Sequence, residues 1–289
     1  PVLSKIKTGL VKRVLSELKK KAENDADSYL AFWENFGAVL KEGIYEDFER
    51  KADIVALGRF KTTHGDGWSS LAEVAGRLKD GQEAIYYATG DNVAALKKSP
   101  QLEGFVAKGV EVLLLTDPID EFWVPALGEW NGHKLVAVTD GGADLSAITT
   151  DPASEADKPE AAEAASLDTL IAALKLNLGD TVKDVRASDR LTSSAVCLVA
   201  DQGQISLHLE KLLKAHKQAD HDTPRILEIN PRHGLIKALA ERVRNSGREA
   251  IEDASWLLLD QARIVEGEMP ADPVDFARRL AGMMEKGIA

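Results

Sequence analysis

The sequence is short of cysteine, of long apolar runs and of positive charge, and each shortage excludes a class of protein. Cys197 is the only cysteine among 289 residues. A single cysteine rules out an internal disulfide and suits a reducing compartment, so we expect a cytoplasmic protein. The longest apolar runs, 110–115 and 256–259, are far shorter than the ~20 residues that a membrane-spanning helix needs. We therefore expect no membrane partner.

The shortage of positive charge argues against binding to nucleic acid. The chain has 36 Lys and Arg against 47 Asp and Glu, which gives a net charge of −11. A nucleic-acid-binding protein gains affinity by neutralising phosphates with Lys and Arg. The one basic run, residues 5–21, falls in a helical pattern without interleaved aromatic residues. A solvated helix face explains that run better than a binding site does.

Apolar spacing predicts an α/β fold for the first part of the chain. Apolar residues recur at helical spacing through residues 2–60, and the aromatic stripe from Tyr29 to Phe36 is typical of a helix core face. Two apolar runs, 84–88 and 110–115, are typical of strands, and helical residues separate them. Strand, helix and strand in this order indicate a parallel βαβ unit. We predict a helical region over 1–80 and a small αβα layered unit over 81–140.

Composition and periodicity predict a second domain. Residues 141–164 are rich in Asp, Glu, Ala, Pro and Gly, which is typical of an acidic linker. Beyond it we expect an α+β domain over 165–289, with a three-stranded antiparallel sheet from 181–187, 195–200 and 225–230 and a terminal helical hairpin. The whole chain is thus predicted to be α/β, or α+β when both parts are taken together.

Acidic residues at the strand ends are the best candidates for an enzyme site. Asp91, Asp117 and Asp120 would cluster beyond the carboxyl ends of the parallel strands, where ligands bind in open α/β sheets. This arrangement could serve a small metal-binding or nucleotide-binding enzyme. The sequence there lacks both Gly-rich phosphate-binding patterns. Helix caps and turns alone also require these residue types, and they are the simpler explanation.

Two amphipathic segments are candidates for partner binding. Residues 204–217 place Ile205, Leu209, Leu212 and Leu213 on one helix face, which by periodicity alone packs on its own sheet or binds a partner. The terminal hairpin is so apolar that we expect a homodimer contact, with packing against the strands of the same chain as the alternative. The residues predicted to form the dimer are Ile251, Ser255, Leu258, Leu259, Ala262, Phe276, Leu280 and Met283.

Several stretches resemble the heat-shock protein 90 chaperone family, particularly its bacterial form. They run in order along the whole chain, and the combination of Phe-Trp-x-x-Phe-Gly, Gly-Gln-x-x-Ile-Tyr-Tyr and Asn-Pro-x-His is highly specific. The stretches are 29–42 (YLAFWENFGAVLKE), 81–87 (GQEAIYY), 109–121 (GVEVLLLTDPIDE), 182–191 (VKDVRASDRL), 229–237 (INPRHGLIK) and 257–262 (LLLDQA).

The resemblance implies the latter part of a middle domain followed by a C-terminal dimerisation domain. The family's ATPase domain, with its ATP and Mg²⁺, precedes this region, so the resemblance implies no cofactor and no ATP hydrolysis for this chain. Nothing here matches the arginine by which the family's middle domain reaches the ATP γ-phosphate, and Arg13 does not inherit that role. The parent protein would belong to an ATP-dependent protein-folding and stress-response machine.

The resemblance also implies the partners of the chain. It favours an exposed, client-binding role for Ile205, Leu209, Leu212 and Leu213, and it points to Phe122 and Trp123 as a second apolar contact for unfolded client proteins. The chain ends in Gly287-Ile288-Ala289, without the acidic Met-Glu-Glu-Val-Asp tail of eukaryotic cytosolic members. We therefore expect a homodimer that binds unfolded clients and no TPR co-chaperones.

Overall fold

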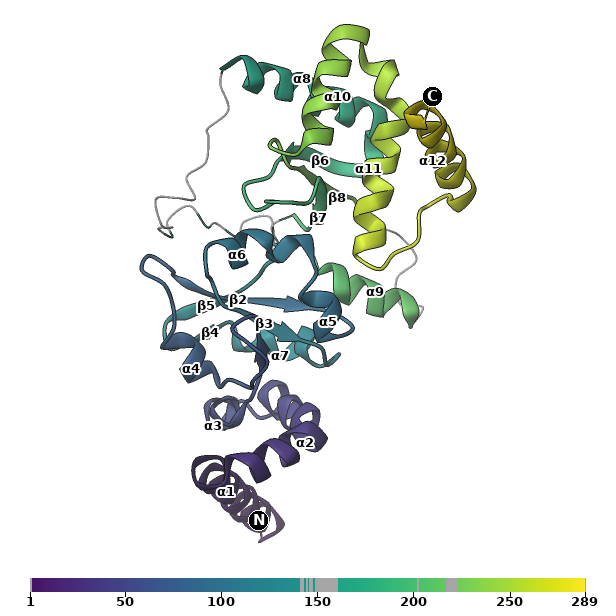
Figure 1. Ribbon diagram of the computed structural model, residues 1–289. Helices are drawn as coiled ribbons and strands as arrows, with labels where there is room; N and C mark the ends of the chain where they lie inside the picture. The colour runs from purple at the N-terminus through teal and green to yellow at the C-terminus, as the bar shows by residue number, and fades with distance from the viewer. Residues whose placement is uncertain are drawn as a thin grey trace. The chain divides into compact units, whose positions relative to one another are not determined.

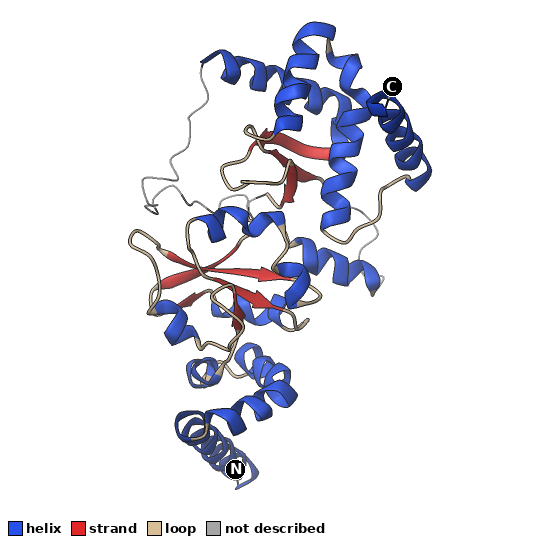
Figure 2. Ribbon diagram, in the orientation of Figure 1, coloured by secondary structure: helices blue, strands red, loops and turns tan. Residues whose placement is uncertain are grey.

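The computed structural model describes residues 2–140, 143, 145, 148, 161–201, 203–216 and 223–288. The chain divides into two compact units: unit 1 consists of residues 1–96 and 111–136, and unit 2 of residues 97–110 and 137–289 (Figure 1). Each unit combines helices with one sheet (Figure 2), so the predicted mixed α/β fold is confirmed. Most of the predicted linker, 141–164, lies outside the described residues. The domain limits 1–140 and 165–289 stay a prediction.

Unit 1 begins with long helices, as the apolar spacing predicts. The second helix starts where Asp25 accepts a hydrogen bond from the Ser28 N–H (3.3 Å), an ordinary N-cap. Its aromatic stripe is buried at Tyr29 and Trp33 but exposed at Phe36. The helices of unit 1 are α1 (Val2–Asn24), α2 (Ala26–Glu46), α3 (Lys51–Leu57), α4 (Leu71–Ala75), α5 (Val93–Leu96) and α7 (Asp120–Leu127).

The sheet of unit 1 has five strands in the order β1-β3-β2-β5-β4. The strands β2 (Ala84–Thr89) and β3 (Val112–Leu115) pair in parallel, with Tyr87 opposite Leu113, which confirms the predicted parallel pair. Every residue of β3 is buried, as expected for a strand covered on both faces. The sheet also contains three strands that we did not predict, β1 (Lys61–Thr62), β4 (Glu129–Trp130) and β5 (His133–Ala137).

Unit 2 places helices against a three-stranded sheet of order β6-β8-β7. The predicted all-antiparallel sheet is wrong, because β6 pairs with β8 in parallel while β7 pairs with β8 antiparallel. The outer strands β6 and β7 run in opposite directions, so a strand placed between them must be parallel to one of them. The elements are η1 (Pro100–Leu102), α6 (Glu103–Ala107), α8 (Ala161–Leu178), η3 (Gly179–Thr181), β6 (Val182–Ala187), β7 (Val196–Val199), α9 (Leu207–Ala215), β8 (Arg225–Ile229), α10 (Gly234–Ser246), η4 (Arg248–Ile251), α11 (Glu252–Val265) and α12 (Pro273–Ile288).

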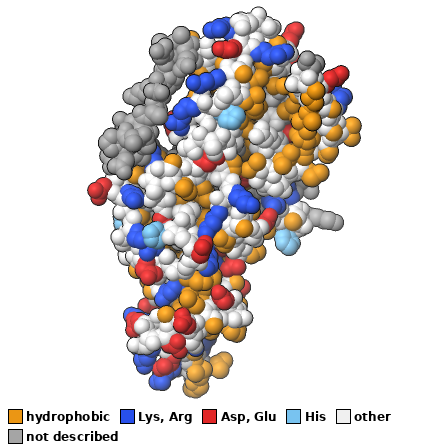
Figure 3. Space-filling model, in the orientation of Figure 1, with side chains coloured by type: hydrophobic (Ala, Val, Ile, Leu, Met, Phe, Trp, Pro, Cys, Tyr) orange, Lys and Arg blue, Asp and Glu red, His pale blue; other side chains and the backbone are white. Residues whose placement is uncertain are grey.

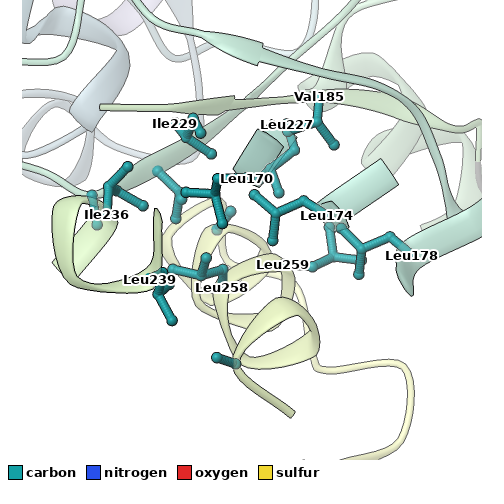
Figure 4. Packing of buried hydrophobic residues seen from close by; sticks show 14 of the residues in the cluster. Leu170, Leu174, Leu178, Val185, Leu227, Ile229, Ile236, Leu239, Leu258 and Leu259 are labelled. Carbon is teal, nitrogen blue, oxygen red and sulfur yellow. The ribbon is translucent and has the colours of Figure 1, made fainter. Parts of the chain in front are cut away.

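The main core of unit 2 lies between its sheet and the helices α8, α10 and α11. Alternate residues of the central strand, Leu227 and Ile229, meet Leu174 of α8 and Leu258 of α11 there (Figure 4). Ile226 of the central strand and Cys197 of β7 belong to a second buried cluster. Cys197 is 2% exposed, and burial raises the pKa of its thiol well above the ordinary value. The prediction that Cys197 is a buried residue and not an activated nucleophile is thereby confirmed.

A buried carboxylate ties the central strand of unit 2 to its neighbour. Glu228 is 2% exposed and lies 2.7 Å from Arg186 Nη2 and 3.1 Å from Arg190 Nε. The Ser188 hydroxyl donates a further hydrogen bond to Glu228 (2.8 Å). A charge this deeply buried is tolerated only with such partners, so the group fixes the pairing of β6 with β8.

Residues 97–110 belong to unit 2 although they connect two elements of unit 1 in sequence. Glu103 accepts hydrogen bonds from the backbone N–H groups of Thr192 (2.7 Å), Ser193 (2.8 Å) and Ser194 (3.1 Å). A Cβ on Gly104 would lie 2.7 Å from the Arg190 carbonyl oxygen, so only glycine allows this approach. Burial tends to raise the pKa of Glu103, but the hydrogen bonds from Ser194, Ser193 and Thr192 lower it to about 2.

We predict that Glu103→Gln destabilises unit 2 in a pH-dependent way. The folded pKa of Glu103 is about 2 against an ordinary 4.5, so its contribution is complete above pH ~4.5 and is lost as the pH falls towards 2. Urea unfolding should show the variant to be less stable than the parent at pH 7, with a smaller difference at pH 3. The exposed Glu83→Gln is the control. A difference that stays constant with pH would contradict the assignment.

Candidate functional site

The amphipathic helix α9 is fixed on one side and partly open on the other. Ser206 caps it by accepting a hydrogen bond from the Leu209 N–H (2.9 Å). Leu207 is buried in the core of unit 2, and Glu210 is buried and forms an ion pair with Arg225. Sequence reasoning missed these two anchors, because the pattern alone did not indicate which side of the helix meets the sheet.

The four residues predicted to bind clients lie away from these anchors. Ile205 is 41% exposed, and Leu209, Leu212 and Leu213 are half-buried. The three leucines occupy positions i, i+3 and i+4, so they share one face of α9. Neither alternative from the sequence holds alone: α9 packs on unit 2 through Leu207 and leaves a second apolar face accessible.

Polar contacts hold α9 beside a cavity of about 260 Å³. Glu210 accepts hydrogen bonds from the Thr223 N–H (2.8 Å) and lies 3.1 Å from Lys214 Nζ. Burial tends to raise the pKa of Glu210, but Thr223, Lys214 and Arg225 together lower it below its usual value. The carboxylate is thus charged at neutral pH and keeps its ion pair. Side chains that line the cavity include Leu207, Glu210, Lys214, Arg225, Arg263 and Glu268.

Only one of the two residues predicted as a second apolar contact is accessible. Phe122 on α7 is 46% exposed. Trp123 is fully buried: it donates a hydrogen bond to Asp120 (2.5 Å) and stacks on Phe60 with ring centroids 5.6 Å apart. The prediction that Trp123 meets a client at the surface is therefore wrong for this structure. Consecutive residues point to different sides of a helix, so Trp123 packs in the core while Phe122 faces solvent.

The acidic residues considered for an enzyme site have other partners. Lys41 of α2 is 5% exposed, and its Nζ lies 2.7 Å from both Asp117 and Asp120. Asp91 lies in the turn before α5 and is exposed. Among the described residues, no group of three or more His, Cys, Asp or Glu side chains is placed to hold a metal ion. The structure therefore favours the structural explanation of these residues over the enzyme hypothesis.

The terminal hairpin divides its apolar residues between core and surface. The predicted dimer residues at the end of η4 and on α11 are at most 2% exposed, because they pack within unit 2; they are Ile251, Ser255, Leu258, Leu259 and Ala262. These five are unavailable to a second chain, so for α11 the alternative of packing within one chain is the correct one.

The helix α12 presents the opposite situation, since none of its residues is buried. It is held to α11 by Arg279, which lies 3.5 Å from Asp253 and 5.3 Å from the ring centroid of Trp256. Phe276 is half-buried, and Leu280 and Met283 are 41% and 36% exposed. Figure 3 shows hydrophobic side chains gathered over this part of unit 2, and the exposed ones include Ile264, Val265, Met269, Val274, Met284 and Ile288.

Comparison with known proteins identifies the family of this chain. A family model described as Hsp90 protein matches residues 1–289. The chain belongs to the Hsp90 family, and the resemblance predicted from its motifs is confirmed.

No helix among the described residues is long and apolar enough to cross a membrane.

Its relatives are bacterial chaperones. The chain is 62% identical over 289 residues to the chaperone protein HtpG of Paramagnetospirillum magneticum, and 56% identical over 293 residues to that of Rhodospirillum rubrum. The HtpG of Roseobacter denitrificans is 50% identical over 291 residues. Each match covers 100% of this chain but only 46–47% of the relative, so the chain spans about half the length of these proteins.

We predict that Leu258→Ala lowers the stability of unit 2 by about 2–5 kcal/mol, because it opens a cavity in a packed core. Leu176→Ala is the matched control, since Leu176 is 66% exposed on α8 and its truncation should cost less than about 0.5 kcal/mol. Urea unfolding at one protein concentration measures both. Equal effects of the two substitutions would contradict the assignment of α11 to the core.

Proposed function

We propose that this chain is the client-binding and dimerising part of a chaperone that acts on unfolded or partly folded proteins. The observation that carries the proposal is the set of exposed or half-buried apolar residues at α9, α7 and α12 in a chain that belongs to the Hsp90 family. Apolar surfaces of this kind suit unfolded partners, because they bind side chains without requiring one sequence. The proposed place of action is the cytoplasm, in keeping with the single cysteine.

ATP is proposed to act through another part of the protein. In the Hsp90 family the nucleotide and Mg²⁺ bind an N-terminal ATPase domain, and the relatives are about twice as long as this chain. Within unit 1, Asp117 and Asp120 are engaged by Lys41, which supports the proposal that they do not serve a metal. The chain alone is therefore expected to lack ATPase activity.

For client binding, α9 and Phe122 are the proposed contacts. Leu207 and Glu210 anchor α9, so its second face can contact an unfolded segment without loss of the helix. Leu209, Leu212, Leu213 and the adjoining Ile205 would supply most of the contact. A half-buried leucine exchanges one apolar neighbour for another at low cost, which supports weak and reversible binding.

For dimerisation, α12 replaces α11 as the proposed contact. An exposed amphipathic helix at the surface of one chain is covered most simply by the same helix of a second copy, because a twofold axis makes the surface self-complementary. Leu280, Met283 and Met284 would lie at the centre of that interface.

We predict that Leu280→Ser, Met283→Ser and Met284→Ser together weaken the dimer by about tenfold or more, because apolar residues at the centre of an interface carry most of its free energy. Light scattering during gel filtration measures the mass, and a monomer has 31.3 kDa. Val106→Ser with Leu176→Ser, two exposed apolar sites elsewhere on unit 2, is the matched control. A parent protein of 31.3 kDa at micromolar concentration would contradict the dimer.

We predict that Ile205→Ser, Leu209→Ser, Leu212→Ser and Leu213→Ser together reduce suppression of client aggregation several-fold, because the apolar face of α9 is lost. Light scattering by a thermally unfolded reporter protein measures the suppression. Circular dichroism checks that the helix persists, and Phe122→Ser gives a second variant that leaves α9 intact. The control is again Val106→Ser with Leu176→Ser. Unchanged suppression in both variants would refute the client surface.

A further inference from the structure

Phe122 does not stand alone at the surface of unit 1. The ring of Tyr45, in the last turn of α2, meets Phe122 with centroids 6.3 Å apart at an angle of 70°, an edge-to-face contact. Tyr45 is 58% exposed and Phe122 is 46% exposed. Two large aromatic side chains therefore offer solvent a joint apolar surface.

A third aromatic side chain extends this surface along α7. Phe48 follows α2 and is 84% exposed. Lys51 Nζ lies 5.1 Å from the Phe48 ring centroid and donates a hydrogen bond to the Ala126 carbonyl oxygen (2.8 Å). Ala126 is one helical turn beyond Phe122, so Lys51 links Phe48 to the part of α7 that follows Phe122. We call Tyr45, Phe48 and Phe122 the aromatic patch.

The helices that carry the aromatic patch are held rigidly. Lys41, one turn before Tyr45 on α2, bonds to Asp120, the first residue of α7, and to Asp117 in the preceding turn, all within unit 1. Breaking a buried, doubly bonded charge costs several kcal/mol, so the two helices keep their relative position. Tyr45 and Phe122 thus belong to a preformed surface.

The segment that carries Tyr45 and Phe48 is rich in acidic residues. Between residues 42 and 51 the chain has four acidic and two basic side chains. Both basic residues are engaged: Arg50 lies 2.6 Å from Asp47 and 4.0 Å from Glu49, and Lys51 contacts Phe48 and Ala126. The exposed carboxylates are those of Glu42, Glu46 and Glu49. A cation near the patch would meet both these carboxylates and the faces of the rings.

We propose that the aromatic patch and its three exposed carboxylates bind client segments in which Lys or Arg stands next to apolar residues. This inference rests on the proposed client-binding function and names the chemistry of the segment at one of its contacts. Lys51 already lies over the Phe48 ring, and the exposed rings of Tyr45 and Phe122 can contact a cation of the client in the same way. A second copy is a poor occupant in patch-to-patch contact, because like charges would face each other.

The test uses the whole chain and three fluorescent, unstructured peptides of about 15 residues. The first peptide alternates Arg and Lys with Leu and Phe, the second has Glu and Asp in place of the basic residues, and the third has Ser in place of the apolar ones. Anisotropy titrations should give the first peptide at least about tenfold tighter binding than the other two. Equal binding of the first and second peptides would overturn the proposal.

Variants then assign the preference to the aromatic patch. Tyr45→Ser with Phe48→Ser should weaken the first peptide about tenfold, and Glu42→Gln, Glu46→Gln and Glu49→Gln together should remove most of the preference for basic residues and its salt dependence. The matched control is Phe36→Ser with Val39→Ser: Phe36 and Val39 are 53% and 61% exposed on the same helix, and Phe36 lies about two and a half turns before Tyr45, on the opposite side of α2. An equal loss in the control would refute the assignment.

Two further measurements separate this inference from the proposed function. Tyr45→Leu with Phe48→Leu keeps apolar area without aromatic rings, so it should bind the first peptide more weakly than the parent but more tightly than the Ser variant. If the α9 variant loses peptide binding while both patch variants retain it, the aromatic patch is excluded and client binding by α9 stands. If no variant changes peptide binding or aggregation, both proposals fail. A change of mass in the patch variants would instead identify a contact between copies.

Discussion

The burial of one face of α11 against the sheet of unit 2 determines which surfaces remain for partners. Leu258, Leu259 and Ala262 contribute to the core that also contains Leu174 and Leu227. Burial stabilises in proportion to the apolar area removed from water, so side chains already buried in the core cannot contribute further area to a dimer interface. The helix α12 is attached through Arg279 to the outside of α11, and its own apolar residues stay open.

Buried charges have a structural role in both units. In unit 1, Lys41 joins α2 to the start of α7, and in unit 2, Glu228 joins β8 to Arg186 and Arg190. Each charge has its partners within hydrogen-bonding distance, which is the condition for burying it. The same contacts give the acidic residues at a strand end a structural role, because Asp120 pairs with Lys41 and accepts a hydrogen bond from Trp123, next to Phe122.

Rigid anchoring beside open apolar surface is the pattern that connects fold and function. The helix α9 is fixed by Leu207 and Glu210, while its Leu209 and Leu212 are only half-buried. In the same way, α7 is fixed by Trp123 and open at Phe122. A preformed surface loses little entropy when an unfolded chain binds, so modest contacts suffice for reversible association. The acidic surroundings of Tyr45 and Phe48 would add a preference for cationic segments.

The sequence by itself determined the family, the mixed α/β class, the parallel pair β2–β3 and the burial of Cys197. Those features follow from local periodicity and from motifs, which read directly along the chain. It did not determine the direction of β6, the small strands β1, β4 and β5, or the inclusion of residues 97–110 in unit 2. Strand direction depends on which strands become neighbours, and Glu103 finds its partners some 90 residues away. Tertiary structure alone decided that Trp123 and Leu258 are buried while Phe122 and Leu280 stay exposed. An apolar residue in a sequence indicates that its burial would be favourable, but it does not indicate which other residues will cover it.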